Sequence, residues 1–337
     1  MTKAYMIPEN LSDFQRLMYM HLIDWKREHI TKDPGQYAGR DYDAVLSADY
    51  QGKLPHLYEP VRQIFLDHQK RFHFKTHKFA DHMASSQIAC ANLFLPIMLH
   101  PDVAPKILAP VKPDMASIAT EELDHGFRVE FWDEPGNMLG DHNKSTGTDA
   151  DFSIAYRNHA GQLCLWLIEH KLTEAEFTTC GGAKSKGRKF GNYACDSTAD
   201  VLANPDLCYY HGKCHYNYWP ITLANEATFP RKNLLSHAGC PFKGGMNQLW
   251  RNTVLALAIE NATEGPYAKY KKVYFSVCHH PANTALNDSM TAFRSLLGDK
   301  DKFSSFTSEP LISAALEISD LEIKTWADWY SDLYLGQ

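Results

Sequence analysis

The strongest constraint on the fold is a pair of apolar, strand-like runs separated by a short turn. The first run covers residues 149–156 and the second covers residues 163–171. The turn between them holds Asn158 and Gly161, which favour tight reversals of the chain. We therefore predict an antiparallel hairpin. Its paired residue numbers are expected to sum to about 319, which places Asp151 opposite residue 168.

Charged residues gather at one end of this hairpin. Side chains alternate between the two faces of a strand, so Glu169 and Lys171 point one way and His170 points the other. Together with Asp151 on the first strand, they place two carboxylates and an ammonium at one end of the apolar hairpin. This arrangement suits a divalent metal ion and an activated water. The alternative is a set of charges that caps the strand ends and faces solvent.

Two further acids are candidate metal ligands. Asp149 points to the same face as Asp151, so either one can reach the metal, and Asp151 is preferred. Glu130 lies near the end of the preceding predicted strand, residues 127–132, and is either an additional ligand or a solvated acid. Carboxylate oxygens of this kind suit Mg²⁺ or Mn²⁺.

The pattern Asp151…Glu169-His170-Lys171 resembles that of the PD-(D/E)xK phosphodiesterase superfamily, which includes restriction endonucleases and recombination exonucleases. The chain is similar to bacterial restriction-endonuclease-like nucleases in residues 85–87 (Ser-Ser-Gln) and in the run 169–174. The resemblance covers residues 80–290. It implies that Asp151 and Glu169 ligate the metal. It also implies that Lys171 orients or helps to deprotonate the attacking water and stabilises the charged phosphorane.

A predicted helix at residues 245–259 forms a second candidate site element. Gln248, Arg251 and Asn252 are spaced three and four residues apart, which places them on one helix face. Some exonucleases of the superfamily have a Gln-x-x-x-Tyr helix in the active site, and this chain matches it only in part. The resemblance implies that Gln248 steadies Lys171 or DNA and that Arg251, with Asn252, contacts the DNA backbone. The alternative is an ordinary solvated helix face.

Four cysteines within one stretch form a candidate metal centre: Cys180, Cys195, Cys208 and Cys214. Four thiolates can hold zinc tetrahedrally or bind a 4Fe–4S cluster. No Cys-x-x-Cys pair is present, although structural zinc sites usually have one. The segment 208–214 resembles the Cys-x5-Cys segment of iron–sulfur nucleases in the superfamily, which favours iron–sulfur slightly. Buried free thiols are the alternative, and Cys240 is a spare ligand at most.

Basic residues follow the predicted active-site strand and suggest a surface for DNA. The loop at residues 184–189 carries four cations, Lys184, Lys186, Arg188 and Lys189. Such a cluster is suited to a nucleic-acid backbone. Residues 68–78 alternate cations with aromatic rings, which is typical of a nucleic-acid surface or, equally, of a solvated helix edge.

Composition limits the classes of protein that this chain can represent. It has 337 residues and a formal net charge of −6, so a uniformly basic surface is excluded. No apolar run is long enough to cross a membrane and no export signal is evident, so we expect a cytoplasmic protein with reduced cysteines.

We predict three regions along the chain. Residues 1–115 form a helical region, residues 116–290 form a nuclease core, and residues 291–337 form a helical end. The core includes a cysteine-rich insertion at residues 180–216.

The sequence thus predicts an α/β (α+β) fold with a restriction-endonuclease-like core, a short mixed sheet flanked by helices. The predicted function is that of a Mg²⁺- or Mn²⁺-dependent deoxyribonuclease in restriction, phage defence or repair. The alternatives are a nucleic-acid-binding protein that does not cut, and a redox or regulatory protein centred on the cysteine-bound metal. DNA is the expected partner, with a homodimer or an accessory subunit as further options.

Overall fold

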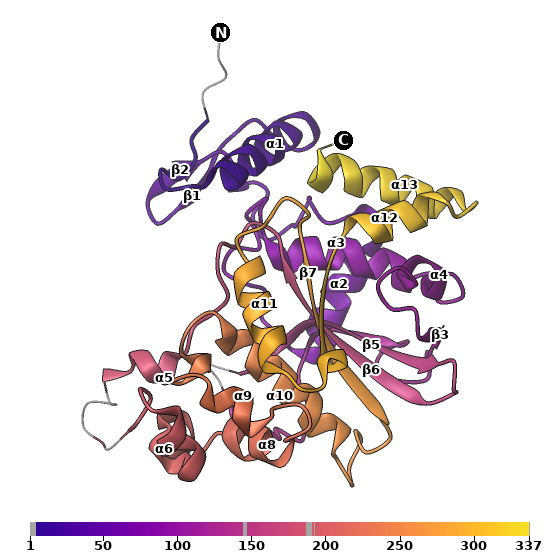
Figure 1. Ribbon diagram of the computed structural model, residues 1–337. Helices are drawn as coiled ribbons and strands as arrows, with labels where there is room; N and C mark the ends of the chain where they lie inside the picture. Colours follow the sequence, from indigo (N-terminus) through magenta and orange to yellow (C-terminus); the bar gives the residue numbers. More distant parts are fainter. Residues whose placement is uncertain (1–4, 144–146, 187–190, 192, 337) are drawn as a thin grey trace.

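The computed structural model describes residues 5–143, 147–186, 191 and 193–336. It has a mixed α/β fold in which helices flank a central mixed sheet, as the sequence predicts. Figure 1 shows the sheet between two groups of helices. This architecture is consistent with a restriction-endonuclease-like fold.

Six strands form the central sheet. They are β3 Met115–Ile118, β4 Phe127–Phe131, β5 Ala150–Asn158, β6 Leu163–Lys171, β7 Lys272–His279 and β8 Phe303–Thr307. The order is β3-β5-β6-β7-β8, with β4 also paired to β5. Strands β3, β4 and β6 run antiparallel to β5, whereas β6, β7 and β8 run parallel to one another.

The middle strand β6 is buried along its whole length and separates two hydrophobic cores. Its even-numbered residues from Cys164 to Ile168 belong to one core, and its odd-numbered residues from Leu163 to Leu167 belong to the other. This alternation is the period of two that a strand imposes on its side chains. A strand covered on both faces needs apolar residues at every position, which explains the continuous run in the sequence.

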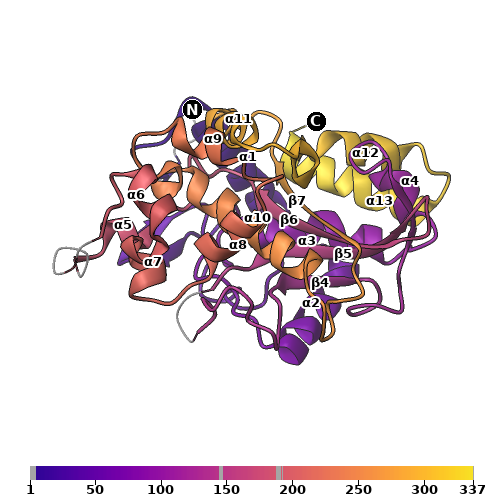
Figure 2. The ribbon, with the colours of Figure 1, turned by 60° about the horizontal axis from the view of Figure 1, so that its bottom comes forward.

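Helices from distant parts of the chain build the first core. They are α2 Glu59–Phe72, α3 Ser86–Met98, α4 Ala104–Leu108, α12 Glu309–Leu316 and α13 Leu321–Tyr330. Helix α3 is buried on all sides because it contacts β5 and β6 on one side and α2 and α13 on others. Figure 2 shows α12 and α13 beside α3 and α4.

The second core lies on the opposite face of the sheet. It contains α8 Tyr218–Ala224, α10 Met246–Glu260 and α11 Asn287–Leu296. Helix α10 contacts β7 and carries its apolar side chains toward the sheet. It therefore sits between the sheet and the long insertion that precedes it in the chain.

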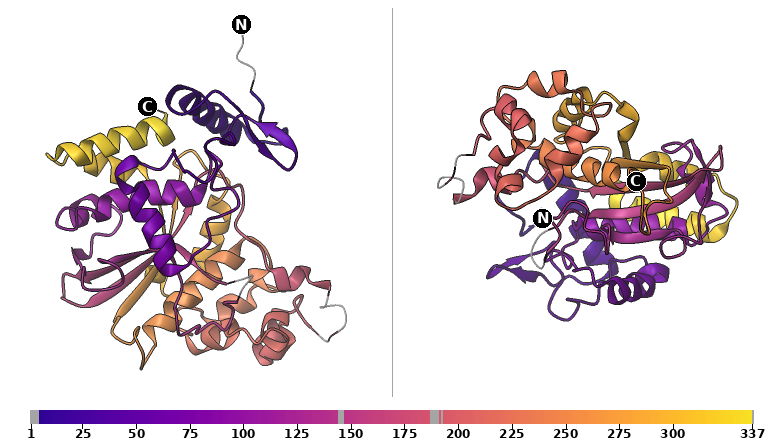
Figure 3. Two further views of the ribbon diagram at one scale, coloured as in Figure 1. Left: turned by 180° about the vertical axis from the view of Figure 1, so that it is seen from behind. Right: turned by 90° about the horizontal axis from the view of Figure 1, so that it is seen from below.

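The insertion between β6 and α10 consists of short helices. They are α5 Gly181–Lys184, α6 Thr198–Ala203, η2 Pro205–Leu207, α7 Tyr209–Gly212, α8, α9 Arg231–Leu235 and η3 Pro241–Lys243. Figure 3 shows this segment at the end of the molecule opposite the C-terminal helices. Elements this short gain little stability from their own backbone hydrogen bonds and depend on tertiary contacts.

The N-terminal region lies beside the C-terminal end. It begins with α1 Asp13–His29, followed by a small hairpin of β1 Gly35–Tyr37 and β2 Arg40–Tyr42. Trp25 Nε1 donates a 2.7 Å hydrogen bond to Asp332 Oδ2, in the terminal π-helical turn η5 Ser331–Leu335. This hydrogen bond links helix α1 to the last turn of the chain.

Most predicted elements are confirmed, with three differences. The hairpin forms, but its pairs sum to 320, as in Phe152 with Ile168 and Arg157 with Leu163. Helix α4 was not predicted. The β1–β2 hairpin was not predicted. Among the described residues, no helix is both long enough and apolar enough to cross a membrane.

Candidate active site

Three acids lie in one row across neighbouring strands. Extending the observed β5–β6 register places Asp151 opposite Glu169, and extending the β4–β5 register places Glu130 opposite Asp151. Residues paired in this way point to the same side of a sheet, with Cβ atoms about 4.5–5.5 Å apart. The one-residue difference from the predicted register therefore matters, because it brings Asp151 and Glu169 to the same face.

The carboxylate of Glu169 is buried and has polar neighbours at both of its oxygens. Gln248 Nε2 donates to Oε1 at 2.6 Å, and Asn252 Nδ2 donates to Oε2 at 3.2 Å. The ammonium of Lys171 lies 2.8 Å from Oε1. Helix α10 and strand β6 thus fix both oxygens of this carboxylate.

Asp151 faces the backbone between Glu169 and Lys171. Its Oδ2 accepts a 2.7 Å hydrogen bond from the N–H of His170. Burial, followed by the charges of Glu169 and Glu130, holds the pKa of Asp151 well above its ordinary value. Lys171 and the His170 amide act in the opposite direction but do not outweigh these effects.

The ammonium of Lys171 is stabilised in its charged form. Burial lowers its pKa, but the nearby charges of Glu169, Glu174 and Asp151 outweigh burial, so the pKa is raised above its ordinary value. Lys171 is therefore a fixed positive charge at neutral pH. In this state it has no free electron pair with which to accept a proton.

Glu130 is held in an unusual backbone conformation. Its φ angle of 50° lies in the left-handed region, which costs a non-glycine residue about 1–3 kcal/mol. Gln87 Nε2 donates a 2.7 Å hydrogen bond to Glu130 Oε1. Burial, with smaller contributions from Asp149 and Glu169, raises the pKa of Glu130 to about 8, although the Gln87 bond opposes the shift. Glu130 is therefore largely protonated at neutral pH.

These groups line a cavity of about 690 Å³. Glu130, Asp151, Glu169, Lys171 and Gln248 form the polar part of its lining. The N-terminal region supplies further lining residues, including Tyr19, Tyr37, Tyr42, Lys75, His77 and Phe79. Sequence reasoning assigned no pocket role to the N-terminal tyrosines, and gave residues 68–78 only as one of two alternatives.

The Ser-Ser-Gln segment at residues 85–87 also reaches the cavity. Ser85 caps α3 by accepting a hydrogen bond from the N–H of Ile88, and Gln87 contacts Glu130 from the first turn of the helix. The sequence similarity noted for this segment thus coincides with a position next to the acids.

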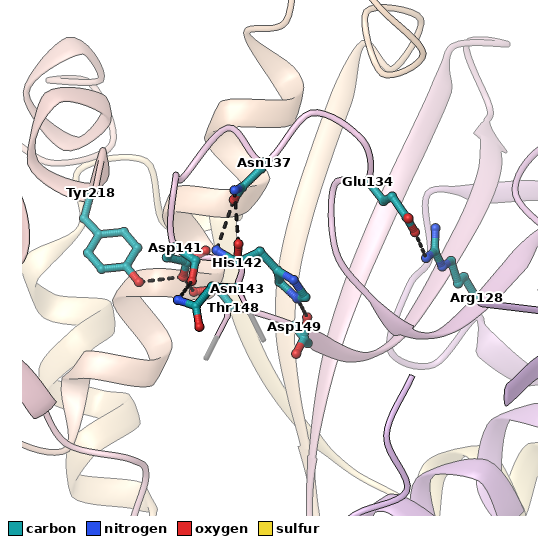
Figure 4. A network of polar contacts seen from close by, with 9 residues as sticks. All are labelled: Arg128, Glu134, Asn137, Asp141, His142, Asn143, Thr148, Asp149 and Tyr218. Carbon is teal, nitrogen blue, oxygen red and sulfur yellow. Dashed lines mark hydrogen bonds and ion pairs between the residues drawn. The ribbon is translucent and has the colours of Figure 1, made fainter. Parts of the chain in front are cut away.

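Asp149 lies in a separate polar network outside the residues that line the cavity. Figure 4 shows its carboxylate directed toward His142, whose Nε2 is 2.7 Å from Asp149 Oδ1. The His142 ring stacks on Trp132 with centroids 3.7 Å apart. Burial lowers the pKa of His142, but the hydrogen bond and charge of Asp149 outweigh it and raise the pKa. Asp151, and not Asp149, lies beside Glu169.

The structure places the residues of α10 that were predicted to contact DNA in different surroundings. Asn252 is buried against Glu169, so its side chain is not available to a nucleic acid. Arg251 is not among the residues that line the cavity, and its guanidinium lies close to the hydroxyl of Tyr218. This corrects the prediction of one shared helix face, because Gln248 and Asn252 point to Glu169 while Arg251 points elsewhere.

The basic loop is described only in part. Lys184 and Lys186 are exposed, as a surface for nucleic acid requires. Arg188 and Lys189 lie outside the described residues.

The cysteine cluster differs from the predicted set by one member. Cys180, Cys195 and Cys208 line a small buried cavity, and the fourth thiol beside them belongs to Cys240. Cys214 does not line that cavity. The prediction grouped cysteines by distance along the sequence, whereas the fold places Cys240 beside the other three.

The three acids of the row are of the type that binds divalent metal ions, but their carboxylates are not placed as ligands of a single ion. Asp151, Glu130 and Glu169 are hard oxygen donors, and the first two have raised pKa values in part because the acids repel one another. A cation between them would relieve this repulsion. Among the described residues, however, no group of three His, Cys, Asp or Glu side chains is arranged to hold a metal ion.

Comparison with known proteins supplies the family. No curated protein and no solved structure matches the chain. Residues 20–335 match the family described as "Restriction Endonuclease associating with ARP". Because the match spans nearly the whole chain, this protein belongs to that restriction endonuclease family.

Proposed function

We propose that the protein is a metal-dependent nuclease that hydrolyses phosphodiester bonds in DNA with a PD-(D/E)xK active site. The observation that carries the proposal is the position of Asp151, Glu169 and Lys171 in the lining of one large cavity. The family match supports a nuclease acting in restriction. The metal, the substrate and the roles of the residues are part of the proposal.

Asp151 and Glu169, with Glu130 beside them, are the residues that would hold Mg²⁺ or Mn²⁺. When bound, the ion would lower the pKa of a coordinated water and offset the charge that develops on the phosphate. Its binding requires the carboxylates to converge, because they are not arranged as a metal site on their own. Binding also requires Asp151 and Glu130 to be ionised, so protons compete with the metal.

Lys171 acts through its charge. An ammonium fixed beside the reacting phosphate stabilises the negative charge that builds up in the transition state. The raised pKa of Lys171 favours this role over proton abstraction from water. Gln248 and Asn252 are positioning residues, because they fix the carboxylate of Glu169 without leaving it free to rotate.

One aromatic wall of the cavity is suited to a nucleotide. The ring centroids of Tyr37 and His77 each lie 5.1 Å from that of Phe79. Tyr37 is 40% exposed, which leaves its ring available for contact with a ligand. Aromatic side chains stack on bases without regard to sequence. We assign this wall, Tyr37, His77 and Phe79, to contact with substrate bases.

The proposal is tested by incubating the protein with linear, circular and single-stranded DNA in the presence of Mg²⁺ or Mn²⁺. We expect cleavage that requires the metal and falls at least about 100-fold in Lys171→Ala. Lys324→Ala, an exposed lysine on α13, is the matched control and should cleave like the wild type. A wild type and Lys171→Ala that are equally inert on every substrate would contradict the nuclease proposal. DNA binding without cleavage would then favour the non-cutting alternative.

A further inference from the structure

The insertion between β6 and α10 encloses a second cavity, separate from the one lined by the acid row. Four of its lining residues are cysteines, Cys180, Cys195, Cys208 and Cys240. The remaining walls are mainly apolar and aromatic, including Val201, Trp219, Phe242 and Trp250. Three of the thiols are buried and the fourth, that of Cys240, is half-buried.

Each of three cysteines begins a short helical turn. Cys180 precedes α5, Cys208 precedes α7 and Cys240 precedes η3. The N–H of Ala183 lies 3.4 Å from Cys180 Sγ. The backbone N–H groups of His211 and Phe242 likewise donate to the sulfurs of Cys208 and Cys240, respectively. Such donors favour the thiolate, which is the form that binds metals.

The four cysteines line one cavity with mainly apolar walls, so their sulfurs lie near one another. Four thiolates in an apolar cavity are unstable without a compensating cation. The other buried cysteines, Cys90, Cys164 and Cys278, belong to the sheet cores and have no such grouping.

The segment that carries the four cysteines consists of short elements. Within the described part of residues 172–245 there is no strand, and no helix is longer than seven residues. The four cysteines come from separate turns of this segment and are free thiols, so no disulfide joins them. A metal centre would tie these turns together, as metal sites do in small domains with little core.

We propose that Cys180, Cys195, Cys208 and Cys240 bind a metal centre, and that this centre is an iron–sulfur cluster and not a single zinc ion. Four sulfurs around one zinc ion, each about 2.3 Å from the metal, lie about 3.8 Å apart. The described cysteines are not grouped for a single ion. A 4Fe–4S cluster holds its ligands farther apart because each thiolate binds a different iron. The aromatic walls exclude water from the cluster.

The test is metal and sulfide analysis of the full-length protein purified without oxygen. We expect about four iron and about four sulfide per chain, with a broad visible absorption. Cys240→Ser should lose most of the iron and the absorption. Cys214→Ser is the matched control, because it removes a nearby thiol outside the cavity, and it should keep the full iron content. Circular dichroism would show whether each variant retains its helices.

Three outcomes would overturn the proposal. The first is a wild type with neither iron nor sulfide, and the second is one zinc ion per chain in place of the cluster. The third is loss of iron in Cys214→Ser, which remains measurable even if Cys240→Ser does not fold. None of these results depends on DNA cleavage, so the metal centre and the nuclease proposal are tested independently.

Discussion

Asp151 Oδ2 accepts a 2.7 Å hydrogen bond from the backbone N–H of His170, the residue between Glu169 and Lys171. This bond fixes the first acid of the pattern against the strand that carries the other two groups. An asparagine oxygen can accept the same bond, so Asp151→Asn removes the charge and preserves the contact. The pair Asp151→Asn and Asp149→Asn therefore separates the two acids that the sequence leaves as alternatives.

We expect Asp151→Asn to reduce DNA cleavage by at least about 100-fold, because it removes a charged ligand from the acid row. Asp149→Asn should keep cleavage within about threefold of the wild type, and should lower stability by about 0–1 kcal/mol through the weakened contact with His142. The measurements are initial rates at saturating Mn²⁺ and urea unfolding. Equal losses of cleavage in both variants would contradict the assignment of Asp151 over Asp149.

Gln248 and Asn252 are expected to act through Glu169. Gln248→Met keeps the length of the side chain and removes the 2.6 Å hydrogen bond to Glu169. We expect a fall in cleavage of about 10-fold together with an increase in the Mn²⁺ concentration needed for half-maximal activity. Gln63→Met, at an exposed glutamine on α2, is the control. A change in rate without a change in metal dependence would show that Gln248 does not position the metal ligand.

The aromatic wall is expected to bind single-stranded DNA without a metal. Tyr37→Ala and Phe79→Ala should each weaken binding by about 1–3 kcal/mol, because each removes a surface on which a base stacks. Fluorescence anisotropy in EDTA measures this affinity without cleavage. Leu321→Ala, which removes a side chain that is 78% exposed on α13, should bind like the wild type. Unchanged affinity in both aromatic variants would exclude the wall as a DNA contact.

Acid is expected to unfold the protein because several histidines are buried in their neutral form. Burial lowers the pKa of His68 and of His280 to about 4, below the ordinary value of 6.5. Their ring nitrogens accept hydrogen bonds from the N–H groups of Val129 and Ala282, which protonation would break.

The direction of this effect follows from proton binding. Between pH 6.5 and about 4 the unfolded chain takes up protons that the folded chain does not, so stability falls as pH falls. We expect urea unfolding to show a loss of several kcal/mol between pH 7 and pH 5. His280→Asn should reduce this loss, whereas His159→Gln, at an exposed position, should not. A stability that is the same at both pH values would contradict the prediction.

The sequence predicted the hairpin but not its register, and the reason lies in one side chain. Asn158 Oδ1 accepts hydrogen bonds from the N–H groups of Ala160 and Gln162, and the Asn158 N–H donates to the Gln162 carbonyl at 3.1 Å. These bonds place Asn158 opposite Gln162 across the turn, so the pairs that follow, beginning with Arg157 and Leu163, sum to 320. The pattern of apolar residues does not reveal such local contacts. A shift of one residue in the register changes which acids lie on the same face of the sheet.

Contacts between distant segments were the least predictable part of the site. The sequence predicted that Glu169 and Lys171 share a face because their spacing is local to one strand, and the two side chains are in contact. The contact of Gln87 with Glu130 and the position of Cys240 in the thiol cluster depend on tertiary folding over tens of residues. No periodicity in the sequence connects such residues, so only the assembled chain brings them together.

The contact between α1 and the end of the chain has a consequence for biosynthesis. Helix α1 supplies Gln15 and Tyr19 to the cavity, and it is held in place by Trp25, which bonds to Asp332. His21 also bonds to backbone oxygens of Asp332 and Leu333. The contacts between α1 and the last turn can therefore form only after residues 332 and 333 have left the ribosome. A nascent chain contains every residue of the acid row well before α1 has this support.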